Sequence, residues 1–88
     1  MDISLGQVVY SKAGRDSKRK FIILSIIDES YVLISDGDLR RIEKPKKKKI
    51  KHLELTGNIP ETIAQKLSTG QKVGNSDIRK ALAAIEGN

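Results

Sequence analysis

The hydrophobic pattern divides the chain into a longer first part and a shorter second part. In the first part, short runs of apolar and β-branched residues alternate with turn residues, and such runs fit a pleated sheet. We predict five strands from these runs, at residues 7–11, 20–27, 31–35, 39–42 and 50–55. The run at 20–27 is almost continuously apolar, which indicates burial on both faces. Five short strands within about 55 residues favour a small barrel that closes on itself.

Two turn signals decide where the later strands are expected. Asp36-Gly37 is typical of a two-residue hairpin turn, because type I′ geometry needs positive φ at both central residues. We therefore predict that the chain returns directly in the strand at 39–42. Pro45 lacks a backbone donor and is expected to interrupt the ladder before the last strand.

The second part, from about residue 58, has the spacing of helices. An apolar stripe recurring every four residues predicts a helix from Pro60 to about residue 67, ended by Gly70. A second helix is predicted from Asn75 or Ser76, which are good N-cap residues. Helices this short are marginal alone, so we expect both to pack on the strand at 20–27. We predict two units, a barrel at 1–56 and a helical extension at 58–88.

Composition limits the class of protein. The 88 residues are 38% hydrophobic and 32% charged, which is typical of a small globular protein. The absence of cysteine excludes disulfides and thiolate metal sites. The first residues lack a signal-peptide pattern, and no apolar run approaches the ~20 residues that span a bilayer. We expect a cytoplasmic protein without membrane contact, monomeric when free.

Positive charge is concentrated in one segment. The net charge is +6, and residues 40–52 alone hold eight basic residues and one acid. Such a block repels itself unless a polyanion neutralises it, although a merely solvated charge run is the alternative. We predict two basic clusters as the binding residues. The first is Lys12, Arg15, Lys18, Arg19 and Lys20; the second is Arg40, Arg41, Lys44, Lys46, Lys47, Lys48, Lys49 and Lys51, with His52 as a phosphate neighbour.

The two kinds of basic residue have different expected roles. Arginine makes planar bidentate contacts with phosphate, so Arg15, Arg40 and Arg41 are expected to position the ligand. Lysine acts as a point charge, and the lysines at 46–49 are expected to supply long-range attraction. In a small barrel the two clusters can lie near each other and form one continuous surface.

Catalysis is not expected. His52 is the sole histidine of the sequence, and nothing pairs with it as a nucleophile or metal cluster. Asp36 and Asp38 flank Gly37, where aspartate is favoured by its own backbone hydrogen bonding. No phosphate-loop or dinucleotide glycine pattern occurs. We predict a protein that is not an enzyme and needs no metal or cofactor.

The scarcity of aromatic residues narrows the partner. The sequence has only three phenylalanine, tyrosine or tryptophan residues, which are Tyr10, Phe21 and Tyr31. Single-stranded nucleic acids and proline-rich ligands need stacking platforms or aromatic grooves. Charge without stacking suits folded RNA, which proteins read through shape, 2′-hydroxyl and phosphate contacts.

Several segments together resemble a known family. Residues 6–9, 13–16 and 21–28 resemble a KOW motif. With residues 36–41, 45–48, 51–53 and 75–82, the ordered set is similar to bacterial KOW-domain RNA-binding proteins, related to a large-subunit ribosomal protein family of archaea and eukaryotes. One departure is visible: Ser17-Lys18 stand where the family pattern has Lys-Gly. Glycine there permits positive φ, which would strain Lys18.

The resemblance implies an SH3-like (KOW) barrel that binds ribosomal RNA of the large subunit, and it includes residues 14–19 in the RNA-contacting region. We therefore expect a mainly β fold, a small five-stranded SH3-like barrel with two short C-terminal helices packed on it. The expected function is non-catalytic binding of structured RNA in translation, with ribosomal proteins as further partners through the helices. Two alternatives stay open: a protein-interaction module, and a transcription-linked KOW protein that binds nucleic acid non-specifically.

Overall fold

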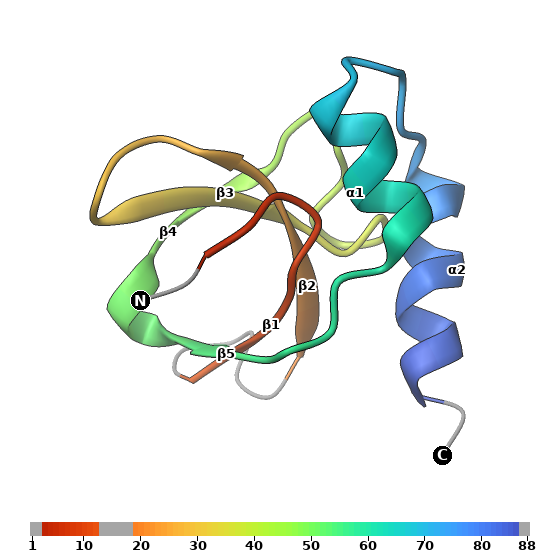
Figure 1. The fold of residues 1–88 in the computed structure, drawn as a ribbon. Coiled ribbons are helices and arrows are strands. Elements are labelled where there is room, and N and C mark those ends of the chain that lie inside the picture. The colour runs from red at the N-terminus through yellow and green to blue at the C-terminus, as the bar shows by residue number, and fades with distance from the viewer. Residues whose placement is uncertain (1–2, 13–18, 87–88) are drawn as a thin grey trace.

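The computed structural model describes residues 3–12 and 19–86. Five antiparallel strands come first in the chain and two helices follow (Figure 1). The sheet order is β4-β3-β2-β1-β5. The elements are β1 (Val8–Ser11), β2 (Lys20–Ile26), β3 (Tyr31–Ser35), β4 (Lys46–Lys49), the 3-10 helix η1 (Ile50–His52), β5 (Leu53–Leu55), α1 (Glu61–Ser68) and α2 (Asn75–Glu86).

The sheet curls around one apolar core. Val9 of β1 lies opposite Phe21 of β2 on one side and Leu55 of β5 on the other, so both ladders extend from the same strand. The buried residues that fill the interior come from β1, β2, β3, β5 and η1: Val9, Phe21, Ile23, Val32, Ile34, Ile50 and Leu53. This arrangement confirms the predicted mainly β fold and is consistent with a small SH3-like barrel.

A second core lies between the outer face of the sheet and the two helices. Val8 and Ile22 are fully buried there, although they neighbour residues that point into the barrel. The helices contribute Ile63 from α1, Ile78 and Leu82 from α2, and Val73 comes from the connection between them. Adjacent strand residues face opposite sides of a sheet, so a strand of continuous apolar residues serves both cores. The predicted packing of the helices on β2 is confirmed.

The predicted fourth strand is wrong. Residues 39–42 form no strand, and ten residues, 36–45, connect β3 to β4. The lysine run at 46–49, which starts directly after Pro45, pairs with β3 on the side opposite β2. Lysine is uncommon in strands, but pairing with a neighbouring strand overrides a weak intrinsic preference, and lysine is favoured on sheet edges. Proline just before a strand removes no donor from its ladder.

Two further features differ from the sequence prediction, the start of the last strand and the turn at Asp36-Gly37. Residues 50–52 form η1 rather than the start of a strand, so β5 has only three residues. The Asp36-Gly37 pair does not make a two-residue hairpin, although Gly37 has the expected positive φ of 75°. α2 begins at Asn75, one of its two predicted starts, and the Gly74 carbonyl accepts hydrogen bonds from the backbone N–H groups of Asp77 and Ile78.

Candidate nucleic-acid interface

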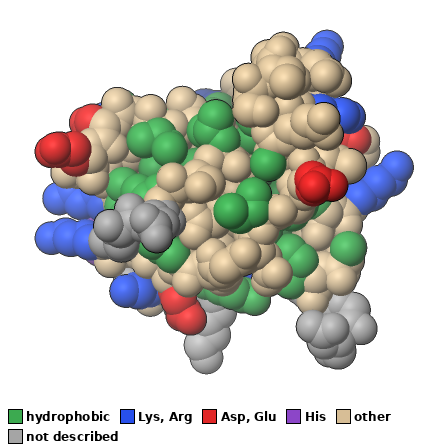
Figure 2. All heavy atoms as spheres, viewed as in Figure 1, with side chains coloured by type: hydrophobic (Ala, Val, Ile, Leu, Met, Phe, Trp, Pro, Cys, Tyr) green, Lys and Arg blue, Asp and Glu red, His purple; other side chains and the backbone are tan. Residues whose placement is uncertain are grey.

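The four lysines of β4 lie on two different faces. Lys46 and Lys48 pair with Ile34 and Val32, whose side chains enter the barrel core, so these two lysines share the inner side of the edge strand. The other two share the outer side with Tyr31, and the Nζ atoms of Lys47 and Lys49 lie 4.6 and 5.9 Å from the Tyr31 ring centroid. Lys and Arg side chains project from the margin of the molecule where β4 lies (Figure 2).

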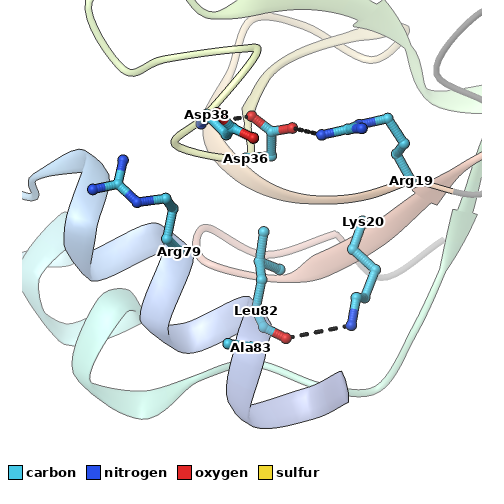
Figure 3. Close-up of a pocket in the computed structure, with 7 residues that line it drawn as sticks. All are labelled: Arg19, Lys20, Asp36, Asp38, Arg79, Leu82 and Ala83. Atoms are coloured by element: carbon cyan, nitrogen blue, oxygen red, sulfur yellow. Dashed lines mark hydrogen bonds and ion pairs between the residues drawn. The ribbon is translucent and has the colours of Figure 1, made fainter. Parts of the chain in front are cut away.

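Arg19 and Lys20 lie at the start of β2, beside α2. Together with Asp36, Arg79 and Leu82 they line a cavity between the barrel and the helix (Figure 3). Arg19 Nη2 donates to Asp36 Oδ2 at 2.7 Å, and Lys20 Nζ donates to the Leu82 carbonyl at 3.3 Å. These two cations therefore take part in holding the barrel, the loop after β3 and α2 together.

A third group of predicted residues lies near β5. Lys12, Lys51 and His52 are exposed, and the Lys12 backbone N–H donates to the His52 carbonyl at 2.9 Å. This bond brings the end of β1 next to η1. Two other predicted residues, Arg15 and Lys18, lie outside the described residues, as does the Ser17-Lys18 departure from the family pattern.

Asp36 organises the loop at 36–45, which we name the β3–β4 loop. Its Oδ1 accepts hydrogen bonds at 2.9 Å from the backbone N–H groups of both Asp38 and Arg40. The Arg40 carbonyl in turn accepts from the backbone N–H of Asp36 and, at 2.6 Å, from the Ser35 hydroxyl. An aspartate that bonds the backbone of its own turn explains why the chain does not return as a strand here.

The pKa of Asp36 is set by opposing effects. Burial alone would raise it, since the side chain is only 5% exposed. The hydrogen bond from Arg19 and those from two backbone N–H groups favour the charged form more strongly. The pKa of the Asp36 carboxyl therefore lies below its ordinary value of 3.8.

Acid is expected to loosen this loop. A carboxyl whose pKa falls on folding stabilises the protein above about pH 4, and this contribution is lost as the pH falls through the folded pKa. Urea unfolding between about pH 2 and pH 6 should therefore show a steeper loss of stability in the parent chain than in Asp36→Asn. The matched control is Asp38→Asn, at an exposed carboxylate two residues away. Parallel curves for the parent and Asp36→Asn would contradict this role of Asp36.

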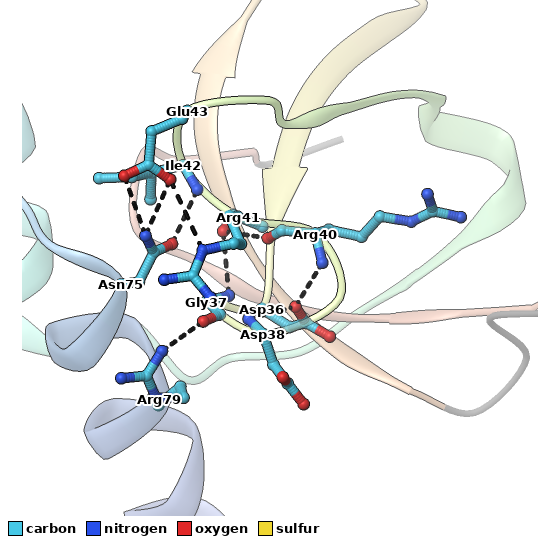
Figure 4. A network of polar contacts seen from close by, with 10 residues as sticks. Asp36, Gly37, Asp38, Arg40, Arg41, Ile42, Glu43, Asn75 and Arg79 are labelled. Carbon is cyan, nitrogen blue, oxygen red and sulfur yellow. Dashed lines mark hydrogen bonds and ion pairs between the residues drawn. The ribbon is translucent and has the colours of Figure 1, made fainter.

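α2 fixes the β3–β4 loop through two side chains one helical turn apart (Figure 4). Asn75 Oδ1 accepts from the Ile42 backbone N–H at 2.8 Å, and its Nδ2 donates to both carboxylate oxygens of Glu43. Arg79 Nη1 donates to the Gly37 carbonyl at 2.5 Å. The Asn75 amide also holds the pKa of Glu43 below its usual value. The helix thus bonds both the start and the end of the loop.

The loop carries a hollow lined by positive charge. Arg40, Arg41, Lys44 and Lys46 line it together with Leu39 and Pro45, and no carboxylate is among its described lining residues. Arg41 and Lys44 are exposed, and Arg41 Nε lies 3.9 Å from Glu43 Oε1, a contact between exposed groups that contributes little. We name this surface the basic hollow. Four cations around one concave surface suit a phosphate backbone.

The structure therefore distributes the predicted binding residues over several surfaces. It brings four of them together at the basic hollow, two beside α2, and three near β5, while β4 divides its lysines between two faces. Contact of any of them with RNA stays a prediction. Sequence reasoning missed Asn75 and Arg79 as residues that shape the site, because both carry ordinary helix signals. Among the described residues, no group of three or more His, Asp or Glu side chains could hold a metal ion.

Several curated proteins that are similar to this chain share one name. Over 54 residues the chain is 41% identical to the large ribosomal subunit protein eL14 of Desulfurococcus amylolyticus, a match that covers 61% of the chain and 56% of that protein. The same name belongs to a Pyrobaculum arsenaticum protein, 35% identical over 54 residues and matched over 52% of its length. A Pyrobaculum aerophilum protein of that name is 28% identical over 82 residues, 93% of the chain and 73% of the relative.

The matches to the first two relatives cover only part of those proteins. The chain spans about half the length of the first two relatives. No protein-family model matches it.

In the part of the chain that the structure describes, neither helix is long and apolar enough to cross a membrane.

Proposed function

We propose that the chain binds structured RNA without catalysing a reaction, and that the RNA is ribosomal RNA of the large subunit. The basic hollow is the observation that carries this proposal, since Arg40, Arg41 and Lys44 of the β3–β4 loop meet Lys46 of β4 there and no carboxylate is among the described residues that line it. A helix holds this loop in place. A preformed cationic surface loses little entropy on binding a phosphate backbone. We propose in addition that the chain is related to the KOW-domain RNA-binding proteins that its sequence resembles.

The names of the relatives support the choice of RNA. Several archaeal proteins named as large ribosomal subunit protein eL14 are similar to the chain, including one matched over most of it. By extension we propose a role in translation, a cytoplasmic location, association with the large subunit and its proteins, and a monomeric state when free. Binding through phosphates requires no metal or cofactor.

The test compares two double variants with the same change of net charge. Arg41→Gln/Lys44→Gln removes two cations of the basic hollow, and Lys66→Gln/Lys80→Gln removes two cations of the helices. Affinity for a fragment of large-subunit ribosomal RNA would be measured by fluorescence anisotropy over a range of salt. The hollow variant should flatten the log–log salt slope by about 2 and weaken binding about tenfold to a hundredfold at ~0.1 M salt.

Three measurements test the proposed function against its alternatives. If the parent engages about six to eight phosphates, its slope should be about −5 to −7. An equal loss in the helix variant would mean that only net charge matters, which would contradict a site at the basic hollow. Equal affinity for duplex DNA of the same length would favour the transcription-linked alternative over ribosomal RNA.

A further inference from the structure

A second surface differs in chemistry from the basic hollow. Ile3 and Leu5 of the N-terminal segment, Ile26 at the end of β2, Ile59 before α1 and Ala64 of α1 line one groove. Figure 2 shows hydrophobic side chains gathered over the middle of the face on which the N-terminal segment lies, with Lys and Arg at the outline of the view. We name this surface the apolar groove.

Two large apolar side chains that line the apolar groove are exposed to solvent. Ile26 is 43% exposed and Ile59 is 44% exposed, although the two residues are far apart in sequence. Single exposed apolar residues are normal on protein surfaces, but several that converge on one concave surface indicate an interaction site. Leu39 is more exposed, at 64%, yet it lies at the basic hollow and does not line this groove.

The walls of the apolar groove are fixed before any partner arrives. Gly6 has a φ of 82°, and a Cβ atom placed on it would lie 2.9 Å from the Ala64 Cα, so the N-terminal segment packs directly on the backbone of α1. The Gln7 side chain accepts from the Ser4 N–H at 2.9 Å and donates to the Thr56 carbonyl at 2.8 Å. A groove already rigid loses less entropy on binding than a surface that must first become ordered.

The charged side chains that line the apolar groove and the hollow beside it are acidic. Glu61 lines it, and an adjoining hollow that shares Ile3 and Ile26 is lined by Asp28 and Glu29. No Lys or Arg is among the described residues that line either surface. These carboxylates repel phosphate, so this surface does not suit RNA, and they attract cations on a partner.

A second copy of the chain fits this surface poorly. A two-fold symmetric dimer places the same patch against itself, so the three carboxylates of each copy would face those of the other. Like charges across an interface are unfavourable. The charge pattern therefore points to a different protein.

We propose that the apolar groove docks a basic segment of another protein, one that inserts an apolar side chain between Ile26 and Ile59 while its Lys or Arg residues pair with Glu61, Asp28 and Glu29. This inference goes beyond RNA binding and uses residues outside the basic hollow. It assigns the two activities to different surfaces, so that the chain links a polyanion to a cationic protein segment.

The experiment uses the full chain and two labelled peptides. One peptide of about ten residues alternates lysine with leucine, and the other has glutamate in place of lysine. Anisotropy should give a Kd of about 10–100 µM for the lysine peptide and at least about tenfold weaker binding for the glutamate peptide. In amide spectra of the chain, the lysine peptide should shift the signals of Ile26, Ile59 and Glu61.

Matched variants test the site itself. Ile59→Ser and Glu61→Lys should each weaken the lysine peptide about tenfold, while Leu39→Ser and Glu54→Lys, at exposed positions away from the groove, should change it less than about twofold. RNA affinity should be the same for Ile59→Ser and the parent, which separates failure of this proposal from failure of RNA binding. Equal binding of both peptides, equal loss in the control variants, or a dimer abolished by Ile59→Ser would each overturn the proposal.

Discussion

Replacing Gly37 with alanine is expected to lower the free energy of unfolding by about 2–4 kcal/mol and to displace the β3–β4 loop. Gly37 has a φ of 75°, which is unfavourable for a residue with a side chain. A Cβ atom there would also clash with the Asn75 carbonyl oxygen, an atom of the α2 backbone that cannot move aside without shifting the helix. Urea unfolding would measure the loss of stability.

Gly70 supplies the matched control. It has the same φ of 75°, but a Cβ atom at Gly70 would meet nothing within 4 Å. Gly70→Ala should therefore show only the conformational cost, about 1 kcal/mol. The difference between the two variants isolates the contact between the loop and α2. RNA affinity should fall in Gly37→Ala and stay unchanged in Gly70→Ala, and equal effects of the two on stability would contradict the packing described here.

A chain that ends at Gly57 is expected to lose its cooperative unfolding transition. The deletion exposes Val8 and Ile22, which are fully buried, and removes four buried apolar residues that cover them. Each buried side chain of this kind stabilises by about 1.5–3 kcal/mol, so the loss approaches the whole stability of about 4–13 kcal/mol expected for a chain of this size. Thermal melting followed by circular dichroism would detect the change.

A single substitution in the same core provides a milder comparison for this deletion. Ile78 is fully buried between α2 and the sheet, and Ile78→Val should cost about 0.5–1.5 kcal/mol while the transition stays cooperative. A shortened chain that melts at the parent's temperature would instead mean that the barrel is an independent folding unit. In that case residue 57 would mark the end of a barrel that folds without the helices.

The position of the helices has a functional consequence under our proposal. Asn75 and Arg79 bond the β3–β4 loop, so α2 supports the surface that carries Arg40, Arg41 and Lys44. Deleting the helices therefore cannot serve as a clean test of whether the barrel alone binds RNA. Point substitutions at the basic hollow, which leave both cores intact, are the better test.

The sequence alone predicted the class of fold because its main signals are local. Alternation of turn residues with β-branched runs located β1, β2 and β3, and an apolar run on β2 indicated burial on both of its faces. Apolar spacing located both helices within one or two residues. Charge and the scarcity of rings pointed to a polyanion, and these are properties of composition.

The tertiary structure decided what depends on contacts between distant residues. Lysine has a weak preference for strands, so the sequence did not indicate that residues 46–49 pair with β3. Asp36-Gly37 has the sequence of a hairpin turn, but in the structure the Asp36 side chain accepts a hydrogen bond from the backbone of its own loop. Pairing then distributes the lysines of β4 over two faces, and α2 gives the basic hollow its shape. Composition fixes how much charge a chain carries, but only its long-range hydrogen bonds and packing fix which charges face the same way.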